Sequence, residues 1–384
     1  MDLPLPPFLD ARDPRSFAHL TLTRRVPRMV AELLRETSLS SAARARLEEM
    51  VNRPLDLRVR RLPIPPSESA HWEEFFATYE GQRLAAMPFF LWEAYLYAWL
   101  LVDTGHYETG VDPFAKAKRD DFAQSLPNME EASRIALRTE AEPPQVTLRA
   151  AVMRSLLANL ADASNPDIQA GPLGGAALLH AEPWQNVEEL LSKGSRVRIF
   201  PDNAMSELFY DLLLARTLAR ASPSVRIELV LKRHPMFVSD ATVDDLAALL
   251  KLVEETPNAT SLSLAAAEVR SLLERDRIGV LVSAELNAPW HFSAPGLVPL
   301  LDPDVLFILK GDANFRRALE DRAWPAVTPL KEACRAPVSR ALFLRVLKSE
   351  CVAGLEPSTL DRVERLDPGW RTNGKHATLQ LLRR

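Results

Sequence analysis

The chain has 384 residues, 47% of them hydrophobic and 26% charged, which suits a globular protein of about two domains. Its 13 glycines are about 3% of the chain against a usual level of about 7%, which disfavours glycine-rich phosphate loops. A net charge of -4 gives no sign of the basic surface that nucleic-acid-binding proteins usually have. Two cysteines cannot form a disulfide framework or a four-cysteine zinc site. If the protein handles phosphate, we expect it to use side chains and a metal.

The N-terminus lacks the basic-then-apolar order of a signal peptide. The longest apolar stretch, residues 89–102, contains Glu93 and is shorter than the roughly 20 residues that a bilayer span needs. We therefore expect a cytoplasmic protein with neither a membrane nor a nucleic acid as partner. The sequence makes no prediction of oligomeric state.

The first 165 residues are predicted to be helical. Ser40 and Ser41 can cap a helix that runs to Glu49. Residues 89–101 are apolar on most sides and indicate a buried helix, and 146–161 repeat apolar residues at helical spacing. Residues 165–175 hold prolines and glycines typical of a linker, so we predict a helical domain over 1–165 and a second domain over 166–384.

Short apolar strands alternate with helices in the second part of the chain. The predicted elements, in order, are a strand at 197–200, a helix at 206–221, a strand at 227–231, a helix at 243–255 and strands at 279–283 and 305–309. This alternation predicts an α/β domain with a parallel sheet. Ligands of such sheets lie beyond the carboxyl ends of the strands, where chemistry is then expected.

Residues 369–376 nearly spell a phosphate-binding loop, but His376 stands where a Ser or Thr should bind magnesium, and no predicted strand precedes them. The chain has no GxGxxG, GxSxG or HExxH motif, and its seven histidines are scattered. Phosphate and metal chemistry must therefore come from other residues.

Acidic and amide side chains follow the first two strands. Asp202 and Asn203 come directly after the first strand, and Asp240 follows Ser239 just before a later helix. Their oxygens are the ligands that hard divalent cations prefer. Asp and Asn are also common helix caps, which is the alternative at both places.

Basic side chains follow the later strands. Lys310 and Arg316 flank Gly311 after the fourth strand, and Arg345 and Lys348 stand further on. These cations can bind phosphate. The alternative is that they are exposed charges in an ordinary turn, which would give the same sequence pattern. Taken together, the segments predict a metal held by Asp and Asn beside a phosphate held by the metal and by Lys or Arg. Such a site suits phosphoryl transfer to water.

The ordered motifs resemble the metal-dependent damage-control phosphatases, and within them subfamily III, the acidic-residue-methyltransferase-like proteins. The resemblance covers most of the chain and is weakest over residues 105–195. The segments that carry it are Asp202-Asn203 with Glu207, residues 237–240, 310–316, 321–324 and 345–348, with further counterparts at 89–97 and 370–375.

The resemblance implies a helical N-terminal region, a Rossmann-like α/β region, a Mn²⁺, Co²⁺ or Mg²⁺ ion, and small sugar phosphates such as fructose 1-phosphate as substrates. It implies Asp202, Asn203 and Asp240 as metal ligands, which form the catalytic set together with Lys348. Glu207 would contact the sugar part. The residues implied to bind the phosphorylated substrate are Asp312, Ala313, Asn314, Phe315, Arg316 and Lys348.

The chain departs from the family pattern at three places. Val346 replaces a motif Thr, which removes one possible hydrogen bond to phosphate. Residues 181–186 replace an Asn-Asp segment, and the end of the chain lacks an acidic tail.

Two other functions stay open. One is S-adenosylmethionine-dependent O-methylation of protein glutamate or other carboxyl groups, although no glycine-rich nucleotide turn follows the first strand. The other is a non-catalytic binding protein with a degenerate site. The presence of all four residues of the implied catalytic set argues against it.

Overall fold

The computed structural model describes residues 4–37, 39–161, 178–193 and 196–384. The predicted linker at 165–175 lies outside these residues, so the domain boundary at 165 stays a prediction. None of the helices in the described ranges is long and apolar enough to cross a membrane.

Fifteen α-helices and seven β-strands make up the regular structure of these ranges. The helices are α1 (Phe17–Leu20), α2 (Val26–Glu36), α3 (Ser41–Asn52), α4 (Pro66–Tyr79), α5 (Phe89–Asp103), α6 (His106–Thr109), α7 (Ala115–Arg138), α8 (Pro144–Ala161), α9 (Trp184–Lys193), α10 (Ser206–Ala221), α11 (Val243–Glu255), α12 (Thr260–Glu274), α13 (Gly311–Ala318), α14 (Leu330–Ala333) and α15 (Pro357–Leu366). The strands are β1 (Leu178–Ala181), β2 (Arg196–Phe200), β3 (Arg226–Lys232), β4 (Ile278–Ser283), β5 (Leu306–Lys310), β6 (Arg340–Val346) and β7 (Ala377–Arg383).

All seven strands form one sheet in the order β1-β7-β6-β5-β2-β3-β4. The run from β6 to β4 is parallel, whereas β7 is antiparallel to β6 and parallel to β1. This sheet confirms the predicted α/β class. Phe200 of β2 lies opposite Leu309 of β5, so the segments that follow these two strands begin side by side.

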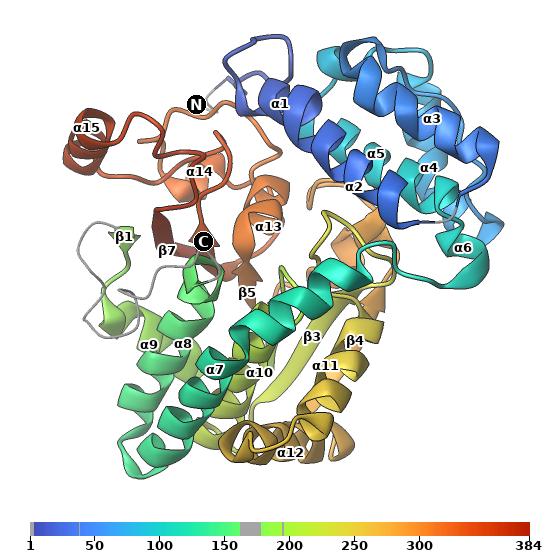
Figure 1. The fold of residues 1–384 in the computed structure, drawn as a ribbon. Coiled ribbons are helices and arrows are strands. Elements are labelled where there is room, and N and C mark those ends of the chain that lie inside the picture. Colours follow the sequence, from blue (N-terminus) through green and yellow to red (C-terminus); the bar gives the residue numbers. More distant parts are fainter. Residues whose placement is uncertain (1–3, 38, 162–177, 194–195) are drawn as a thin grey trace.

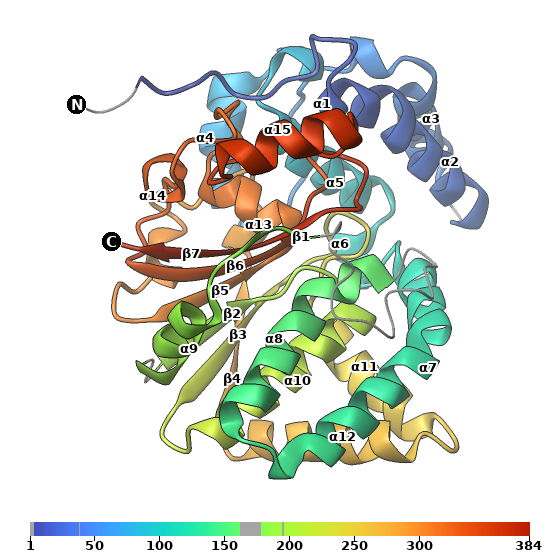
Figure 2. The same ribbon diagram turned by 90° about the vertical axis from the view of Figure 1, so that its left-hand side faces the viewer.

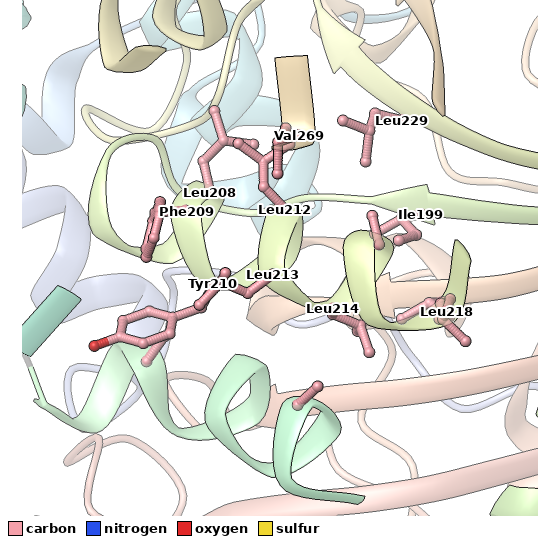
Figure 3. Packing of buried hydrophobic residues seen from close by; sticks show 14 of the residues in the cluster. Ile199, Leu208, Phe209, Tyr210, Leu212, Leu213, Leu214, Leu218, Leu229 and Val269 are labelled. Carbon is pink, nitrogen blue, oxygen red and sulfur yellow. The ribbon is translucent and has the colours of Figure 1, made fainter. Parts of the chain in front are cut away.

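Helices α7, α8, α10, α11 and α12 gather on one face of the sheet (Figure 2). The central helix α10 is buried on nearly all sides. Its leucines contact Ile199 and Leu229 of the sheet and Val269 of α12 (Figure 3). Apolar side chains of α7 and α8 belong to the same core, although both helices precede residue 165. These two helices are therefore packed as part of the sheet's helical layer.

Helices α1 to α6 form a second region around α5, seen in blue and cyan at the top of Figure 1. Helix α5 is buried almost throughout because its sequence is apolar on every side. Met236, from the loop after β3, is part of this helical core, and Phe237 and Val238 pack against it. That loop thus joins the helical region to the sheet.

Most elements that the sequence predicted are present within one or two residues. Ser40 caps α3 by accepting a hydrogen bond from the Ala43 amide at 3.2 Å. The sequence missed β1 and β7. Arg345 lies at the end of β6, and Lys348 follows two residues after this strand. Residues 369–376 lie between helix α15 and strand β7. A phosphate-binding loop instead follows a strand and precedes a helix.

Candidate functional site

Two loops at the carboxyl end of the sheet are tied together by their backbones. The Ala241 amide donates to the Asp202 carbonyl at 2.9 Å, and the Ala204 amide donates to the Ser239 carbonyl at 2.6 Å. Asn203 and Asp240 also form an isolated antiparallel bridge. The structure therefore brings together the three predicted metal ligands.

The backbone is strained on both of these loops. Phe237 and Val238 have φ of 49° and 68°, and Met205 has φ of 49°. Such angles cost about 1–3 kcal/mol each and persist only where packing enforces them. The Phe237 ring packs 5.2 Å from Tyr97 and 5.8 Å from Phe90, measured between ring centroids. Helix α5 thus contributes to holding the strained loop that carries Asp240.

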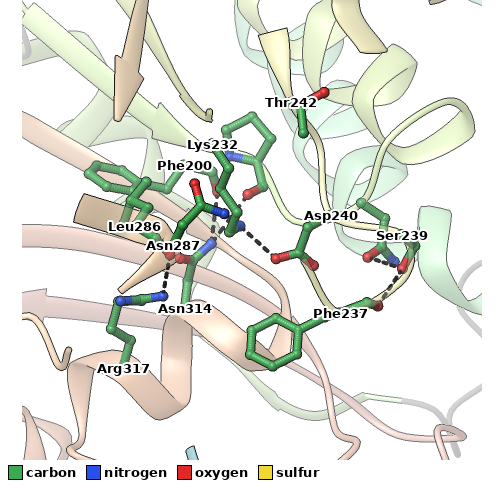
Figure 4. A network of polar contacts seen from close by, with 12 residues as sticks. Phe200, Lys232, Phe237, Ser239, Asp240, Thr242, Leu286, Asn287, Asn314 and Arg317 are labelled. Atoms are coloured by element: carbon green, nitrogen blue, oxygen red, sulfur yellow. Dashed lines mark hydrogen bonds and ion pairs between the residues drawn. The ribbon is translucent and has the colours of Figure 1, made fainter. Parts of the chain in front are cut away.

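The carboxylates of Asp202 and Asp240 are buried and close enough to repel each other. Burial, with the charges of Asp240 and then Glu207, raises the pKa of Asp202 well above its ordinary value. Burial also raises the pKa of Asp240, although Lys232 Nζ lies 2.8 Å from Asp240 Oδ2 and opposes this shift (Figure 4). Burial of these two neighbouring carboxylates therefore disfavours their ionised forms, even with Lys232 beside Asp240.

Neither carboxylate serves as a helix cap. The residue before α10 is Met205, which makes no capping hydrogen bond, and α11 is capped by Thr242 in a capping box with Asp245. The capping alternative for Asp202, Asn203 and Asp240 is therefore wrong. Their side chains are available for other chemistry.

Glu207 lies on the first turn of α10 beside Asn203. The Asn203 Nδ2 group donates to Glu207 Oε1, while Asn203 Oδ1 accepts a hydrogen bond from Ser239 Oγ at 2.7 Å. Burial raises the pKa of Glu207 to about 7, opposed by the charges of Lys348 and Lys310. The amide of Asn203 thus links the two loops.

The start of α10 is capped from a distance by Asp121 of α7. Ser206 donates from its amide to Asp121 Oδ2 at 3.0 Å and from its hydroxyl to Asp121 Oδ1 at 3.1 Å. Sequence reasoning missed this residue. No local pattern could reveal it, because the cap and the helix start are far apart in the chain.

Gly311 lets the segment after β5 approach Asp202. Its φ is +78°, and a Cβ added there would lie 1.8 Å from Asp202 Oδ2. Real Cβ atoms do not approach other atoms so closely. A glycine is needed here both for its backbone angle and for the space that Asp202 occupies.

A cavity of about 390 Å³ opens beside these loops. This volume is within the usual range of small-molecule sites. Helix α7 forms the wall opposite the strand ends. The lining residues used below are Asn203, Glu207 and Lys348 on the sheet side, and Lys118, Asp120, Asp121 and Gln124 on α7.

Asp312 is held by the end of β6. Its Oδ1 atom accepts from Arg345 Nη2 at 2.6 Å, Ser349 Oγ at 3.1 Å and the Lys348 amide at 3.1 Å. Burial would raise the pKa of Asp312, but the charges of Arg345 and Arg316 outweigh it and keep the pKa below its ordinary value. Asp312 therefore positions the backbone of Lys348.

Arg316 is engaged by two carboxylates. It makes paired 2.9 Å hydrogen bonds to Asp321 and a 2.7 Å bond to Glu93 of α5. Asp321 also accepts the Phe90 amide, near the start of α5, at 2.8 Å. These contacts join α13 to the helical region.

The other residues of this motif also make internal contacts. Asn314 Nδ2 donates to the Lys310 carbonyl at 2.8 Å, and Phe315 packs under Arg345, 4.1 Å from its guanidinium. Lys310 Nζ lies 3.1 Å from Asp211 Oδ1. Five predicted substrate residues are absent from the described lining of the cavity, namely Asp312, Ala313, Asn314, Phe315 and Arg316. Their assignment to the substrate therefore stays a prediction.

The predicted ligand set suits a hard divalent cation in its chemistry. Asp202 and Asp240 supply carboxylate oxygens, their mutual repulsion calls for a cation, and Asn203 adds an amide oxygen. Within the described ranges, however, no three His, Cys, Asp or Glu side chains are grouped to hold a metal. The set has two carboxylates at its centre, so the remaining ligands would have to come from Asn203, substrate or water.

Known proteins similar to this chain are named as damage-control phosphatases. The damage-control phosphatase named ARMT1 from Bos taurus is 31% identical over 196 residues, which are 49% of this chain and 44% of that protein. The Homo sapiens protein of the same name is 28% identical over 198 residues, again 49% and 44%. The matched part thus spans less than half the length of these relatives.

A DUF89 family protein from Pyrococcus horikoshii has a solved structure that aligns with 94% of this chain and 96% of its own, at 14% identity and a TM-score of 0.44. The family model described as "Damage-control phosphatase ARMT1-like domain" matches residues 21–363. Because this match takes in most of the chain, including both strained loops and the buried carboxylates, the protein belongs to the family of damage-control phosphatase ARMT1-like domains.

Proposed function

We propose that the protein is a divalent-metal-dependent phosphatase that hydrolyses small phosphorylated metabolites, with sugar phosphates such as fructose 1-phosphate as the substrate class. The observation that carries this proposal is the buried pair of Asp202 and Asp240, whose like charges meet at the carboxyl end of the sheet beside a cavity. The family membership and the names of the relatives support the same activity.

Asp202, Asp240 and Asn203 would hold the metal, for which Mn²⁺, Co²⁺ and Mg²⁺ are the candidates. When bound, such an ion polarises the phosphoryl group and orients the attacking water. The metal's charge would also offset the repulsion that raises the pKa of Asp202. The three residues come from two loops, so the metal would fasten the loops to each other.

The chain's other residues act on the substrate. Lys348, placed by Asp312, stabilises the negative charge on the phosphoryl oxygens. Glu207 accepts hydrogen bonds from the polar part of the substrate. In the reaction the oxygen of water bonds to phosphorus while the bond from phosphorus to the ester oxygen breaks. One proton of water ends on the released alcohol.

The test is phosphate release from a panel of sugar phosphates by chelator-treated protein, with and without each metal. We expect release only with metal, and a loss of at least about a hundredfold in Asp240→Asn, because one ligand charge is removed. The exposed Asp244 on the following helix gives a matched control, and Asp244→Asn should keep full activity.

Two results would contradict the proposal. One is phosphate release that is the same without metal and in Asp240→Asn. The other is methyl transfer from S-adenosylmethionine to a protein carboxylate with no phosphate release from any compound, which would favour the methyltransferase alternative instead.

A further inference from the structure

The two walls of the cavity differ in charge. The sheet-side wall presents Lys348 together with Glu207 and Asn203, and Asp202 and Asp240 are the chain neighbours of the lining residues Asn203 and Ser239. The opposite wall, on α7, presents the carboxylates of Asp120 and Asp121 and the amide of Gln124. A phosphate group at the sheet side therefore leaves the rest of its molecule facing an acidic surface.

The one lysine on the α7 wall does not offset this acidity. Lys118 Nζ lies 2.7 Å from Asp245 Oδ2 and 2.9 Å from Asp112 Oδ2, and only 2% of its side chain is exposed. Its charge is thus balanced by two carboxylates that do not line the cavity. The group formed by Lys118 and these two aspartates is itself net negative.

Asp120 and Asp121 both line the cavity, and no buried cation of the α7 wall pairs with them within the described residues. Asp121 is hydrogen bonded by the amide and hydroxyl of Ser206, which are neutral donors. Asp120 pairs with Lys116 at 3.1 Å, but both side chains are more than half exposed, and such pairs are weak and screened. A second anionic group on a bound molecule would have to lie against this wall.

We propose that the α7 wall selects phosphate monoesters with an uncharged polar body and rejects compounds with a second phosphate or a carboxylate. Like charges placed side by side disfavour binding, so Asp120 and Asp121 act as the repulsive element of specificity. Gln124 can donate and accept hydrogen bonds to hydroxyl groups of the uncharged body. This inference rests on the proposed phosphatase function and narrows its substrate class.

The test compares fructose 1-phosphate with fructose 1,6-bisphosphate, which differ by one phosphate. We expect kcat/KM to favour the monophosphate in the unmodified protein. Asp120→Asn should shift the ratio of the two kcat/KM values toward the bisphosphate by on the order of threefold to tenfold, the effect of one charge near a protein surface. Raising NaCl from about 0.05 M to about 0.5 M should narrow the preference of the unmodified protein, since salt screens the repulsion.

The matched control is Glu131→Gln, which removes the same charge from an exposed site about 16 Å further along α7. It should leave the ratio unchanged. Equal kcat/KM values for the two compounds in the unmodified protein would overturn the inference, as would an unchanged ratio in Asp120→Asn.

The inference and the proposed function can fail separately. If neither compound releases phosphate under any metal, the phosphatase proposal fails. The same two compounds are then titrated calorimetrically onto Mn²⁺-loaded protein. Tighter binding of the monophosphate, lessened in Asp120→Asn, supports the selecting wall, and equal affinities overturn it.

Discussion

Two charged regions lie at the same end of the sheet and differ in how their carboxylates are paired. In one, Asp202 and Asp240 lie close enough to repel each other, and burial raises the pKa of both. In the other, Arg316 lies between Asp321 and Glu93, and these charges raise its pKa further above the ordinary value despite burial. In the second region, therefore, both carboxylates bind one guanidinium group of the chain.

On the proposed function, this difference separates residues that bind a ligand from residues that stabilise the fold. A buried charge whose partners are all in the chain stabilises a particular packing, here that of α13 on α5. Buried like charges without enough partners make folding costlier and are kept where a bound cation balances them. In the sequence, each region was represented by charged residues after strands, Asp202 and Asp240 in the first and Arg316 in the second.

The largest effect is expected for Gly311→Ala. The new Cβ would meet Asp202 Oδ2, so the carboxylate must move and metal-dependent phosphate release should fall by about a hundredfold or more. Gly81→Ala is the matched control, since its φ of +81° is similar but nothing lies within 4 Å of the added Cβ. It should cost only about 1–2 kcal/mol of stability and keep activity. Equal activity in both variants would contradict the close approach.

Arg316→Ala tests the second region, in which Arg316 binds both Asp321 and Glu93. It leaves the buried carboxylates of Asp321 and Glu93 without their partner, so the free energy of unfolding should fall by about 3–5 kcal/mol. Arg226→Ala, which breaks an exposed pair with Asp276, should change it by less than about 1 kcal/mol. Denaturant unfolding gives both values. If Arg316→Lys raises the KM for phosphate esters and leaves the stability unchanged, the result would support substrate binding by Arg316 instead.

Glu207→Gln should give the smallest effect, in the pH dependence of stability without metal. The pKa of Glu207 is about 7 in the folded chain and near its ordinary value when unfolded, so its contribution to stability is full below about pH 4.5. That contribution is lost as pH rises through 7, by on the order of 3 kcal/mol. Unfolding of both proteins across this window should show a weaker loss in Glu207→Gln. If the free energy of unfolding of the two proteins changes with pH in the same way, the raised pKa of the buried Glu207 carboxyl is contradicted.

The sequence predicted the parts of the site that depend on local pattern. Apolar runs of β2, β3 and β5 were recognisable, and the strand-end rule placed Asp202 and Asp240 at one edge of the sheet. Contacts between distant segments were not predictable. Arg316 and Glu93 are separated by 223 positions, and Asp121 and Ser206 by 85.

Helix α7 shows this limit most clearly. Its sequence is typical of an ordinary amphipathic helix, with exposed acidic and basic residues. Only the folded chain shows that Asp120 and Asp121 line a cavity. The resemblance to known phosphatases was also weakest there, so neither pattern nor relatives pointed to this wall.

The loop after β3 has one more consequence. Met236 lies in the core of the helical region, and only a few residues later Asp240 joins the carboxylate pair. The packing of the helical region therefore holds the loop that carries Asp240, so a substitution in the core around Met236 can alter the proposed metal site from a distance.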